Sequence, residues 1–374
     1  NFHVVGNADK ITVTLNDNRT FSAKVVGSDQ PSDLAVVKIE SGNLPFLNLG
    51  NSDNVRIGDI VLAIGNPLGI GQTVTAGIIS AKGRQTGLSD GSFEDFLQTD
   101  APINQGNSGG ALVNLNGELI GINSQILSGS QGGGNIGIGF SIPSNMAKSV
   151  MEQLDKSGKV RRGMLGVGIQ LLTESLAEKF NVKDKKGVLV NQVNAGSAAE
   201  KAGIKRDDVI VAINGEKVED PNTLRNKVAG TLPGTQIKVT VLRDGREQDF
   251  TATLDELEVK KTENKNSGGD KNDSDNSLEN GKLGLSLQPV TPEILKQLQL
   301  PIDTKGLVVT DVDPNGAAAE EGIKRGDVIL EINKKSVSTI EDVQSALETN
   351  GDKPILLLVS RRGQSLYLTV TPVK

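Results

Sequence analysis

The chain contains one sequence unit twice, and this internal repeat limits the possible folds more than any other feature. Three pairs of identical residues lie 119 positions apart: Gly187 and Gly306, Asp208 and Asp327, and Asn214 and Asn333. Each copy begins with a Leu-Gly-aliphatic step, at Leu165 and Leu283, and later has a helix-like segment, at 222–229 and 340–348, followed by a strand pair. The C-terminal part is therefore expected to hold two domains of one kind.

The residues before the repeats indicate a different, β-rich domain. Residues 1–145 read as short strands separated by Gly, Asn, Asp and Pro, a pattern typical of an all-β barrel or sandwich. A glycine-rich loop at 128–134 is expected to be mobile, and apolar residues at helical spacing predict a helix over 144–157. Between the repeats, 261–280 contains a single aliphatic residue, so it is expected to be a flexible tether that lets the second repeat move.

Composition excludes several classes of function. The 374 residues suggest two to three domains, and no apolar run approaches the roughly 20 residues of a membrane span. The net charge of −6, with both signs interspersed, gives no reason to expect a nucleic-acid partner. With no cysteine, one histidine and no Walker-type loop, we expect no metal and no cofactor.

The stretch Gly106-Asn-Ser-Gly-Gly suggests a nucleophilic serine. Ser108 between glycines can lie on a tight turn beside free N–H groups, which acyl transfer requires. A serine needs a base, and the only histidine, His3, and an aspartate before a hydrophobic run, Asp33, both lie upstream. The order His, Asp, Ser is that of chymotrypsin-like enzymes. Each element alone also fits an ordinary loop, a surface histidine or a strand start, but the combination favours catalysis.

These residues resemble the HtrA (Do-like) serine endopeptidases of the bacterial envelope, of the DegP/DegQ type. The matching segments cover nearly the whole chain and include 3–5, 32–36, 98–101, 106–112 and 137–143. The resemblance implies a mainly β fold, with a chymotrypsin-like double β-barrel protease domain over 1–157 and PDZ domains over 158–260 and 281–374, joined by the linker 261–280. The early strands of the first barrel, which should precede His3, are missing from this sequence. We expect that the natural protein has them, the alternative being an incomplete first barrel.

The resemblance also implies residue roles. Ser108 would be the nucleophile, His3 the general base and acid, Asp33 the residue that orients His3, and the N–H groups of Gly106 and Ser108 the oxyanion hole. Four aliphatic residues match the family's specificity pocket, although they also fit an ordinary barrel core: Ile126, Leu127, Ile136 and Ile138. Gln105 stands where related enzymes often have arginine.

The repeats resemble PDZ domains, which bind peptide C-termini. The carboxylate-binding loop of the first copy matches five residues: Gly163, Met164, Leu165, Gly166 and Val167. In the second copy it matches 281–285, where a packing role in assembly is equally compatible. The segment 84–95 matches the family's sensor loop, with Arg84 as a relay candidate or simply a surface residue.

The function implied is an ATP-independent, periplasmic serine endopeptidase that degrades misfolded or unfolded envelope proteins. Its PDZ domains would bind exposed C-termini and control assembly of a homo-oligomer, a trimer and possibly larger cages. The main alternative is a proteolytically impaired peptide-binding scaffold or chaperone, and a weaker one is a regulatory protease with a single partner. Neither nucleic acid nor an integral membrane segment is expected.

Overall fold

The computed structural model describes residues 1–87, 92–128, 134–184, 186–258, 278–280, 283–298 and 300–372. These residues form two compact units, which are described separately. The first comprises 1–163 and 222–233, and the second 164–221 and 234–374. Within the described ranges, no helix has both the length and the apolar character needed to cross a membrane. Most of the predicted tether and of the 128–134 loop lies outside the described residues, as do Gly281 and Lys282.

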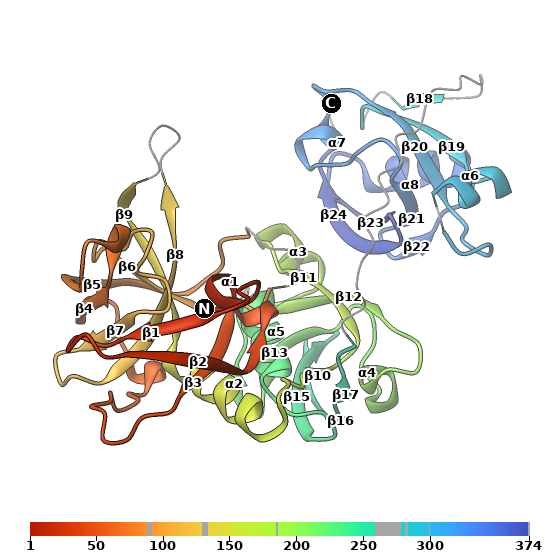
Figure 1. The fold of residues 1–374 in the computed structure, drawn as a ribbon. Helices are drawn as coiled ribbons and strands as arrows, with labels where there is room; N and C mark the ends of the chain where they lie inside the picture. Colours follow the sequence, from red (N-terminus) through yellow and green to blue (C-terminus); the bar gives the residue numbers. More distant parts are fainter. Residues whose placement is uncertain are drawn as a thin grey trace. The chain divides into compact units, whose positions relative to one another are not determined.

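A closed six-stranded barrel forms the centre of the first unit (Figure 1). Its strands, in spatial order, are β4 (Ile60–Gly65), β5 (Thr73–Arg84), β6 (Phe96–Thr99), β9 (Asn135–Pro143), β8 (Leu119–Ser128) and β7 (Ala111–Asn114). Alternate side chains point inward, as the two-residue strand period requires, so Val61, Ala63 and Ile79 are buried. The β-barrel that the sequence predicts for this part of the chain is confirmed here.

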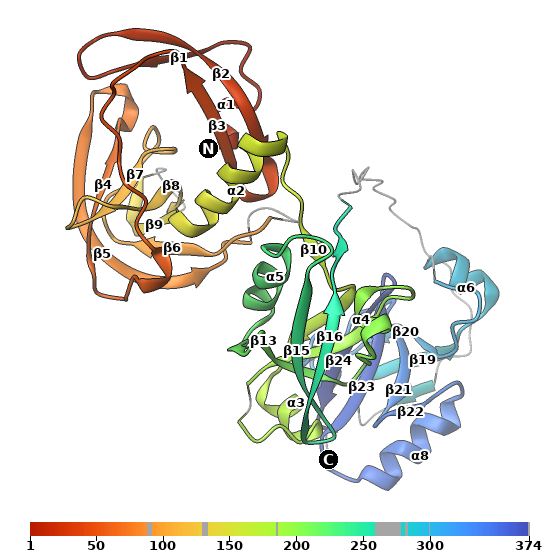
Figure 2. The same ribbon diagram turned by 90° about the horizontal axis from the view of Figure 1, so that it is seen from below.

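A separate antiparallel sheet precedes this barrel and contains only three strands. These are β1 (Ile11–Thr14), β2 (Thr20–Asp29) and β3 (Leu34–Ile39), in that order. Figure 2 shows helix α2 (Ser144–Ser157) beside this sheet, and Leu154 and Val150 of α2 share a buried cluster with Leu34 of β3. The short helix α1 (Phe2–Val5), which contains the only histidine, comes before β1. This sheet therefore consists of three strands in the described chain.

Short 3-10 turns complete the N-terminal part of the chain. They are η1 (Gln30–Ser32), η2 (Ser52–Asn54) and η3 (Pro67–Gly69). Helix α5 (Pro221–Ala229) lies in sequence within the first repeat, but from Asn222 onward it clusters with the first unit.

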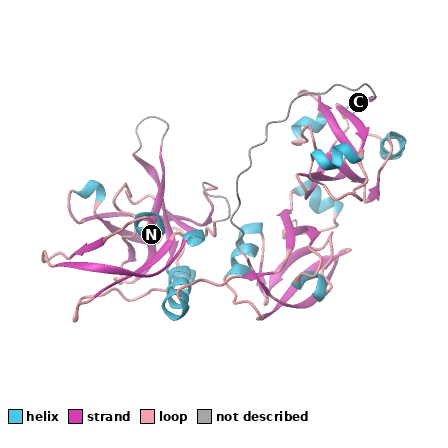
Figure 3. Cartoon of the chain, turned by 45° about the vertical axis from the view of Figure 1, so that its right-hand side comes forward, coloured by secondary structure: helices cyan, strands magenta, loops and turns pink. Residues whose placement is uncertain are grey.

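The two repeats, which are dominated by strands (Figure 3), share one order of elements from β11 to β16 and from β19 to β24. The first contains β10 (Gly163–Met164), β11 (Val167–Leu171), α3 (Glu174–Lys179), β12 (Val188–Val193), α4 (Ala198–Ala202), β13 (Val209–Ile213), β14 (Glu216–Lys217), α5, β15 (Gln236–Arg243), β16 (Arg246–Thr253) and β17 (Asp255–Glu256). The second contains β18 (Leu278–Asn280), β19 (Leu285–Pro289), α6 (Pro292–Gln297), β20 (Leu307–Val312), α7 (Ala317–Glu320), β21 (Val328–Ile332), β22 (Lys335–Ser336), α8 (Ile340–Asn350), β23 (Ile355–Arg361) and β24 (Gln364–Val370). The sheets run β11-β12-β13-β15-β16 and β18-β19-β20-β21-β23-β24.

The second repeat packs against the first instead of hanging free on the tether. One buried apolar cluster is shared by both repeats and consists of Leu172, Leu176, Ala177, Phe180, Val182, Leu189, Val209, Leu356, Leu358 and Tyr367. The ring of Tyr367 meets the ring of Phe180 edge-on, with 5.3 Å between centroids. In this structure the two repeats share a buried cluster, and the expectation that the second repeat moves relative to the first stays a prediction.

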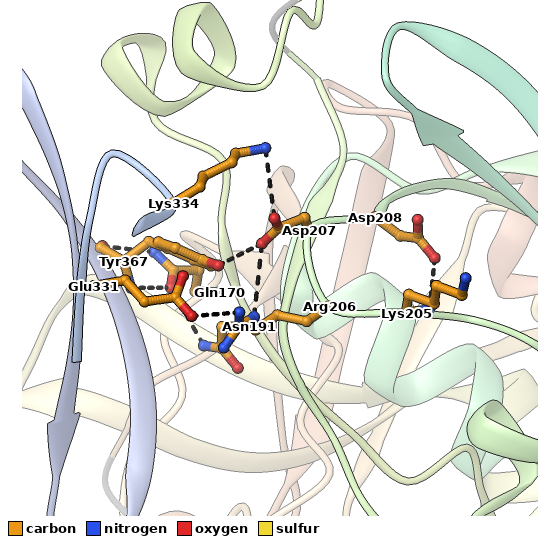
Figure 4. A network of polar contacts seen from close by, with 9 residues as sticks. All are labelled: Gln170, Asn191, Lys205, Arg206, Asp207, Asp208, Glu331, Lys334 and Tyr367. Carbon is orange, nitrogen blue, oxygen red and sulfur yellow. Dashed lines mark hydrogen bonds and ion pairs between the residues drawn. The ribbon is translucent and has the colours of Figure 1, made fainter. Parts of the chain in front are cut away.

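Polar contacts surround this shared cluster (Figure 4). The phenol of Tyr367 donates to Asp207, and the Gln170 amide bonds both the N–H and the carbonyl of Tyr367, at 2.8 and 3.0 Å. Arg206 pairs with Glu331 at 2.6 Å. Burial and then the bond to Asp207 raise the pKa of the Tyr367 phenol far above its ordinary value. The interface is therefore both apolar at its centre and specifically bonded at its edge.

Candidate active site

Asp33 is placed by a tight turn between β2 and β3. Asp29, the last residue of β2, caps the 3-10 turn η1. Its carboxylate accepts hydrogen bonds from the backbone N–H and the hydroxyl of Ser32. The turn ends with Asp33 in the left-handed region, at φ 56°. Aspartate tolerates this conformation better than most residues, so the local sequence favours the turn.

His3 is bound to Asp33 at two points. The His3 backbone N–H donates to Oδ1 of Asp33 at 2.9 Å, and ring Nδ1 lies 2.8 Å from Oδ2. An ionised carboxylate only accepts, so Nδ1 carries the proton and Nε2 is left as the basic nitrogen. The side chains of His3 and Asp33 are 49% and 27% exposed.

Ser124 joins the two halves of the site. Its hydroxyl donates to Oδ2 of Asp33 at 2.9 Å, and its carbonyl accepts the hydroxyl of Ser108, also at 2.9 Å. The three predicted residues His3, Asp33 and Ser108 therefore meet around one residue of β8, although they come from α1, the β2–β3 turn and the β6–β7 loop. Ser108 Oγ bonds Ser124 in this structure, and among the described residues it has no hydrogen bond to His3. Sequence reasoning missed Ser124, which no motif marked.

The glycine-rich turn fits the geometry of an anion site. Gly106 has φ +98°, and a Cβ there would lie 2.4 Å from the Asn66 carbonyl, so only glycine fits. Within the described ranges, the N–H groups of Gly106 and Ser108 donate to no other group, whereas those of Gly109 and Gly110 are bonded to Asn123 and Asn107 carbonyls. Two unengaged donors next to Ser108 are the arrangement that an oxyanion requires.

The four pocket candidates do not share one surface. Ile126 packs against the barrel core, and Ile138 packs against the separate cluster that includes α2. Leu127 and Ile136 are exposed at 44% and 57%. A hollow of about 410 Å³ does adjoin the site, and it is lined by His3, Asp33, Ser124, Gln125 and residues of 30–32 and 92–96.

A buried ion pair supports the turn that holds Asp33. Arg162 bonds both carboxylate oxygens of Asp29, at 2.8 and 2.5 Å, with both side chains less than a tenth exposed. Phe93 lies beside the guanidiniums of Arg162 and Arg225, at 4.5 and 5.0 Å from its ring centroid. This pair was also missed, since Asp29 and Arg162 are far apart in sequence.

The sensor-loop segment contacts helix α5, but through other residues than the one predicted. Asn222 and Asn226 donate to the Glu94 carbonyl at 2.8 and 2.7 Å, and Gln85 donates to Asn222 at 2.6 Å. Arg84, the relay candidate, bonds Gln98 on the neighbouring strand β6. Gln105 contributes its carbonyl to the Leu68 N–H, and residues 88–91 of the segment lie outside the described part.

The predicted carboxylate-binding loop has a backbone suited to an anion. Leu165 is buried and its carbonyl accepts the Ala199 N–H, while Gly166 has φ +79°. In the described part of the chain, the N–H groups of Leu165 and Gly166 have no acceptor. Gly163 and Met164 form β10, and Val167 begins β11. No group of three potential metal ligands occurs among the residues that the structure describes.

Comparison with known proteins identifies the family. A trypsin-like peptidase domain matches residues 1–122, and PDZ domains match 163–254 and 308–361. A probable periplasmic serine endoprotease, DegP-like, of Chlamydia trachomatis serovar D is 45% identical over 361 residues, covering 96% of this chain and 69% of that protein. The chain belongs to the HtrA family of serine proteases.

Further relatives agree with this assignment. A probable periplasmic serine protease do/HhoA-like of Haemophilus influenzae is 43% identical over 371 residues, covering 99% of this HtrA protease and 75% of that protein. A solved HtrA-type protease, AlgW with tripeptide, is 47% identical with a TM-score of 0.60, covering 70% of this chain and 85% of that one. The predictions of a serine endoprotease, of PDZ domains and of a periplasmic location are confirmed.

Proposed function

We propose that this HtrA protease cleaves peptide bonds with His3, Asp33 and Ser108 as its catalytic triad. The observation that carries the proposal is that Asp33 and Ser108 both bond Ser124, while the ring of His3 is bonded to Asp33. A chance arrangement of a surface histidine and a loop serine would not require a shared partner on a barrel strand.

The chemistry follows from the protonation pattern. Asp33 fixes the His3 tautomer, so Nε2 can accept the Ser108 proton once the hydroxyl turns from the Ser124 carbonyl toward the imidazole. Ser108 Oγ then bonds the peptide carbonyl carbon, and the resulting oxyanion faces the N–H groups of Gly106 and Ser108. His3 returns the proton to the leaving amine as the C–N bond breaks, and water repeats the sequence to release the acyl group.

The substrates proposed are unfolded or misfolded proteins of the envelope. The scissile segment has to be extended to pair with β9 near 136–138, beyond the residues of β9 that pair with β6, and a folded protein does not offer such a segment. The first PDZ loop, 163–167, would capture the C-terminal carboxylate of such a chain, in the manner of PDZ domains generally. Assembly into trimers and larger cages, with PDZ control, belongs to the same proposal.

Casein turnover tests the catalytic assignment. Ser108→Ala is expected to reduce the rate by about 10⁶-fold, as removal of a triad serine does elsewhere. Ser22→Ala, which alters an exposed serine on β2, is the matched control and should keep the wild-type rate. Equal turnover by wild type and Ser108→Ala would reject the triad, and a folded wild type without activity would favour the peptide-binding scaffold.

Mass spectrometry of the same digests tests the specificity proposal. Ile126, Leu127, Ile136 and Ile138 match the family's aliphatic pocket in sequence but do not share one surface here, so cleavage after Val, Ile, Ala or Leu is proposed from the sequence match alone. Cuts made mainly after Lys or Arg would refute an aliphatic pocket.

A further inference from the structure

The two repeats differ at the one sheet edge where a PDZ domain receives a peptide. In the first repeat, β11 is the end strand of its sheet. In the second, the corresponding strand β19 is not terminal, because β18 lies beyond it (Figure 1). A peptide binds a PDZ domain by adding a strand to this edge. The first edge is therefore open in the described structure, and the second is covered by the chain itself.

The strands compared are equivalent in detail. Both follow a Leu-Gly step with glycine at positive φ, +79° at Gly166 and +70° at Gly284. The Leu165 and Leu283 carbonyls accept the N–H groups of Ala199 and Ala318, and β11 and β19 both have a register shift after their second residue. Since the rest of the site repeats so closely, the added strand is a specific difference.

The covering strand has the direction of a bound ligand. Leu278 lies opposite Leu287, Glu279 opposite Ser286 and Asn280 opposite Leu285, so β18 runs antiparallel to β19. It therefore runs toward the Leu283-Gly284 loop. A peptide whose C-terminal carboxylate is captured at that loop must run the same way.

We propose that β18 is an internal ligand of the second PDZ domain and closes the peptide edge of that domain to other chains. The inference rests on the proposed peptide binding by the repeats and specifies which of them is closed to it. A tethered segment acts at an effective concentration in the millimolar range. A free peptide of equal intrinsic affinity at micromolar concentration is therefore outcompeted by β18.

Proline substitutions in the full-length chain test whether β18 occupies the edge. Residues along an antiparallel strand alternate between bonded and non-bonded positions. Either Glu279→Pro or the double variant Leu278→Pro/Asn280→Pro must therefore remove an N–H from the ladder. In at least one of them, amides of 285–287 should exchange with deuterium at least tenfold faster. Lys271→Pro, in the same polar segment, is the control and should leave exchange unchanged.

The free peptide Asp-Asn-Ser-Leu-Glu-Asn, identical to 275–280, is the probe for displacement. It should restore slow exchange at 285–287 in the responsive proline variant, at a concentration at least tenfold lower than any that affects wild type. Unchanged exchange at 285–287 in both proline variants would overturn the proposal, as would equal binding of the probe at this edge in wild type and variant. Neither readout depends on proteolysis or on the first repeat, so failure of the triad or of first-domain binding would be distinguishable.

A disulfide provides a second measurement that does not rely on disruption. The chain has no cysteine, so Glu279→Cys/Ser286→Cys creates one possible bond between directly opposite residues. Oxidation should close it and abolish probe binding at this edge. Asn280→Cys/Gln288→Cys, offset by about 10 Å along the strand, should not close. Failure of the first pair to oxidise would contradict the assigned register.

Discussion

Tyr367 allows the packing of the two repeats to be measured directly. It is the only tyrosine of the chain, and the chain has no tryptophan, so tyrosinate absorbance reports on this side chain alone. Its phenol is 2% exposed, and it donates to the carboxylate of Asp207. Burial and that bond favour the neutral phenol and raise its pKa. Alkaline titration of the native protein should therefore show no tyrosinate near pH 10, where a free tyrosine ionises.

The sign of the effect on stability follows from proton binding. Above pH about 10, a separated or unfolded second repeat loses the phenolic proton while the packed form keeps it. Stability that is fully present below pH 10 is therefore lost as the pH rises, by about 1.4 kcal/mol at pH 11. Tyr367→Phe should abolish this slope. It should also reduce stability at neutral pH by about 1.5–3 kcal/mol, because a bond to a charged group is removed.

Leu358→Ala tests the apolar part of the same interface. Removal of this buried side chain should cost about 2–5 kcal/mol and bring the tyrosinate transition down toward pH 10. Ile302→Ala, at an 88% exposed aliphatic residue of the same repeat, is the control and should change neither. A wild-type protein whose tyrosine ionises like the free amino acid would refute the packed arrangement of the repeats.

Two further predictions concern the catalytic unit. Arg162→Met should destabilise it by about 3–5 kcal/mol in urea unfolding, because Asp29 would be left buried without its cation. Adding Asp29→Asn should recover part of the loss. An unchanged midpoint of urea unfolding in Arg162→Met would contradict the burial of the pair. Ser124→Ala should lower kcat/KM by about 10- to 100-fold, because the bond to Asp33 is lost. Ser124→Thr keeps a hydroxyl and should retain most activity. Equal activity of the two variants would show that the Ser124 hydroxyl does not position Asp33.

The sequence predicted those parts of the site that depend on residue type and order. His3 and Asp33 were paired because a nucleophilic serine needs a base and the base needs an orienting carboxylate, and the structure brings them to 2.8 Å. The Gly106–Gly110 turn could be predicted from the sequence because glycine, which has no Cβ, adopts positive φ without a steric penalty.

Residues that act through tertiary placement were not predictable in this way. Ser124 is one of several serines in the chain, and its role depends on the position of β8 in the closed barrel. For the pocket candidates, matching residue types did not predict a shared position in the fold. Ile126 and Ile138 match by residue type, but neighbouring strands direct them to different clusters.

One sequence feature does indicate that the second repeat packs against the first. Five consecutive aliphatic residues, 355–359, form most of β23, and all are buried. A strand with one solvent face alternates apolar and polar residues, so a continuous run indicates burial on both faces. Ile355, Leu357 and Val359 fill the core of the second repeat, while Leu356 and Leu358 enter the cluster shared with the first.

This double burial argues for different roles of the two PDZ domains. A face of the second repeat is committed to the first by Leu356, Leu358 and Tyr367, and its peptide edge is paired with β18. Each of these contacts covers a surface that would otherwise be available to a partner. The first repeat keeps β11 as an end strand beside the unpaired N–H groups of Leu165 and Gly166 in the described chain. Its loop begins one residue after Arg162, whose partner Asp29 caps the turn that holds Asp33. The first domain therefore keeps an open peptide edge in the described chain, whereas the edge of the second domain is paired with β18.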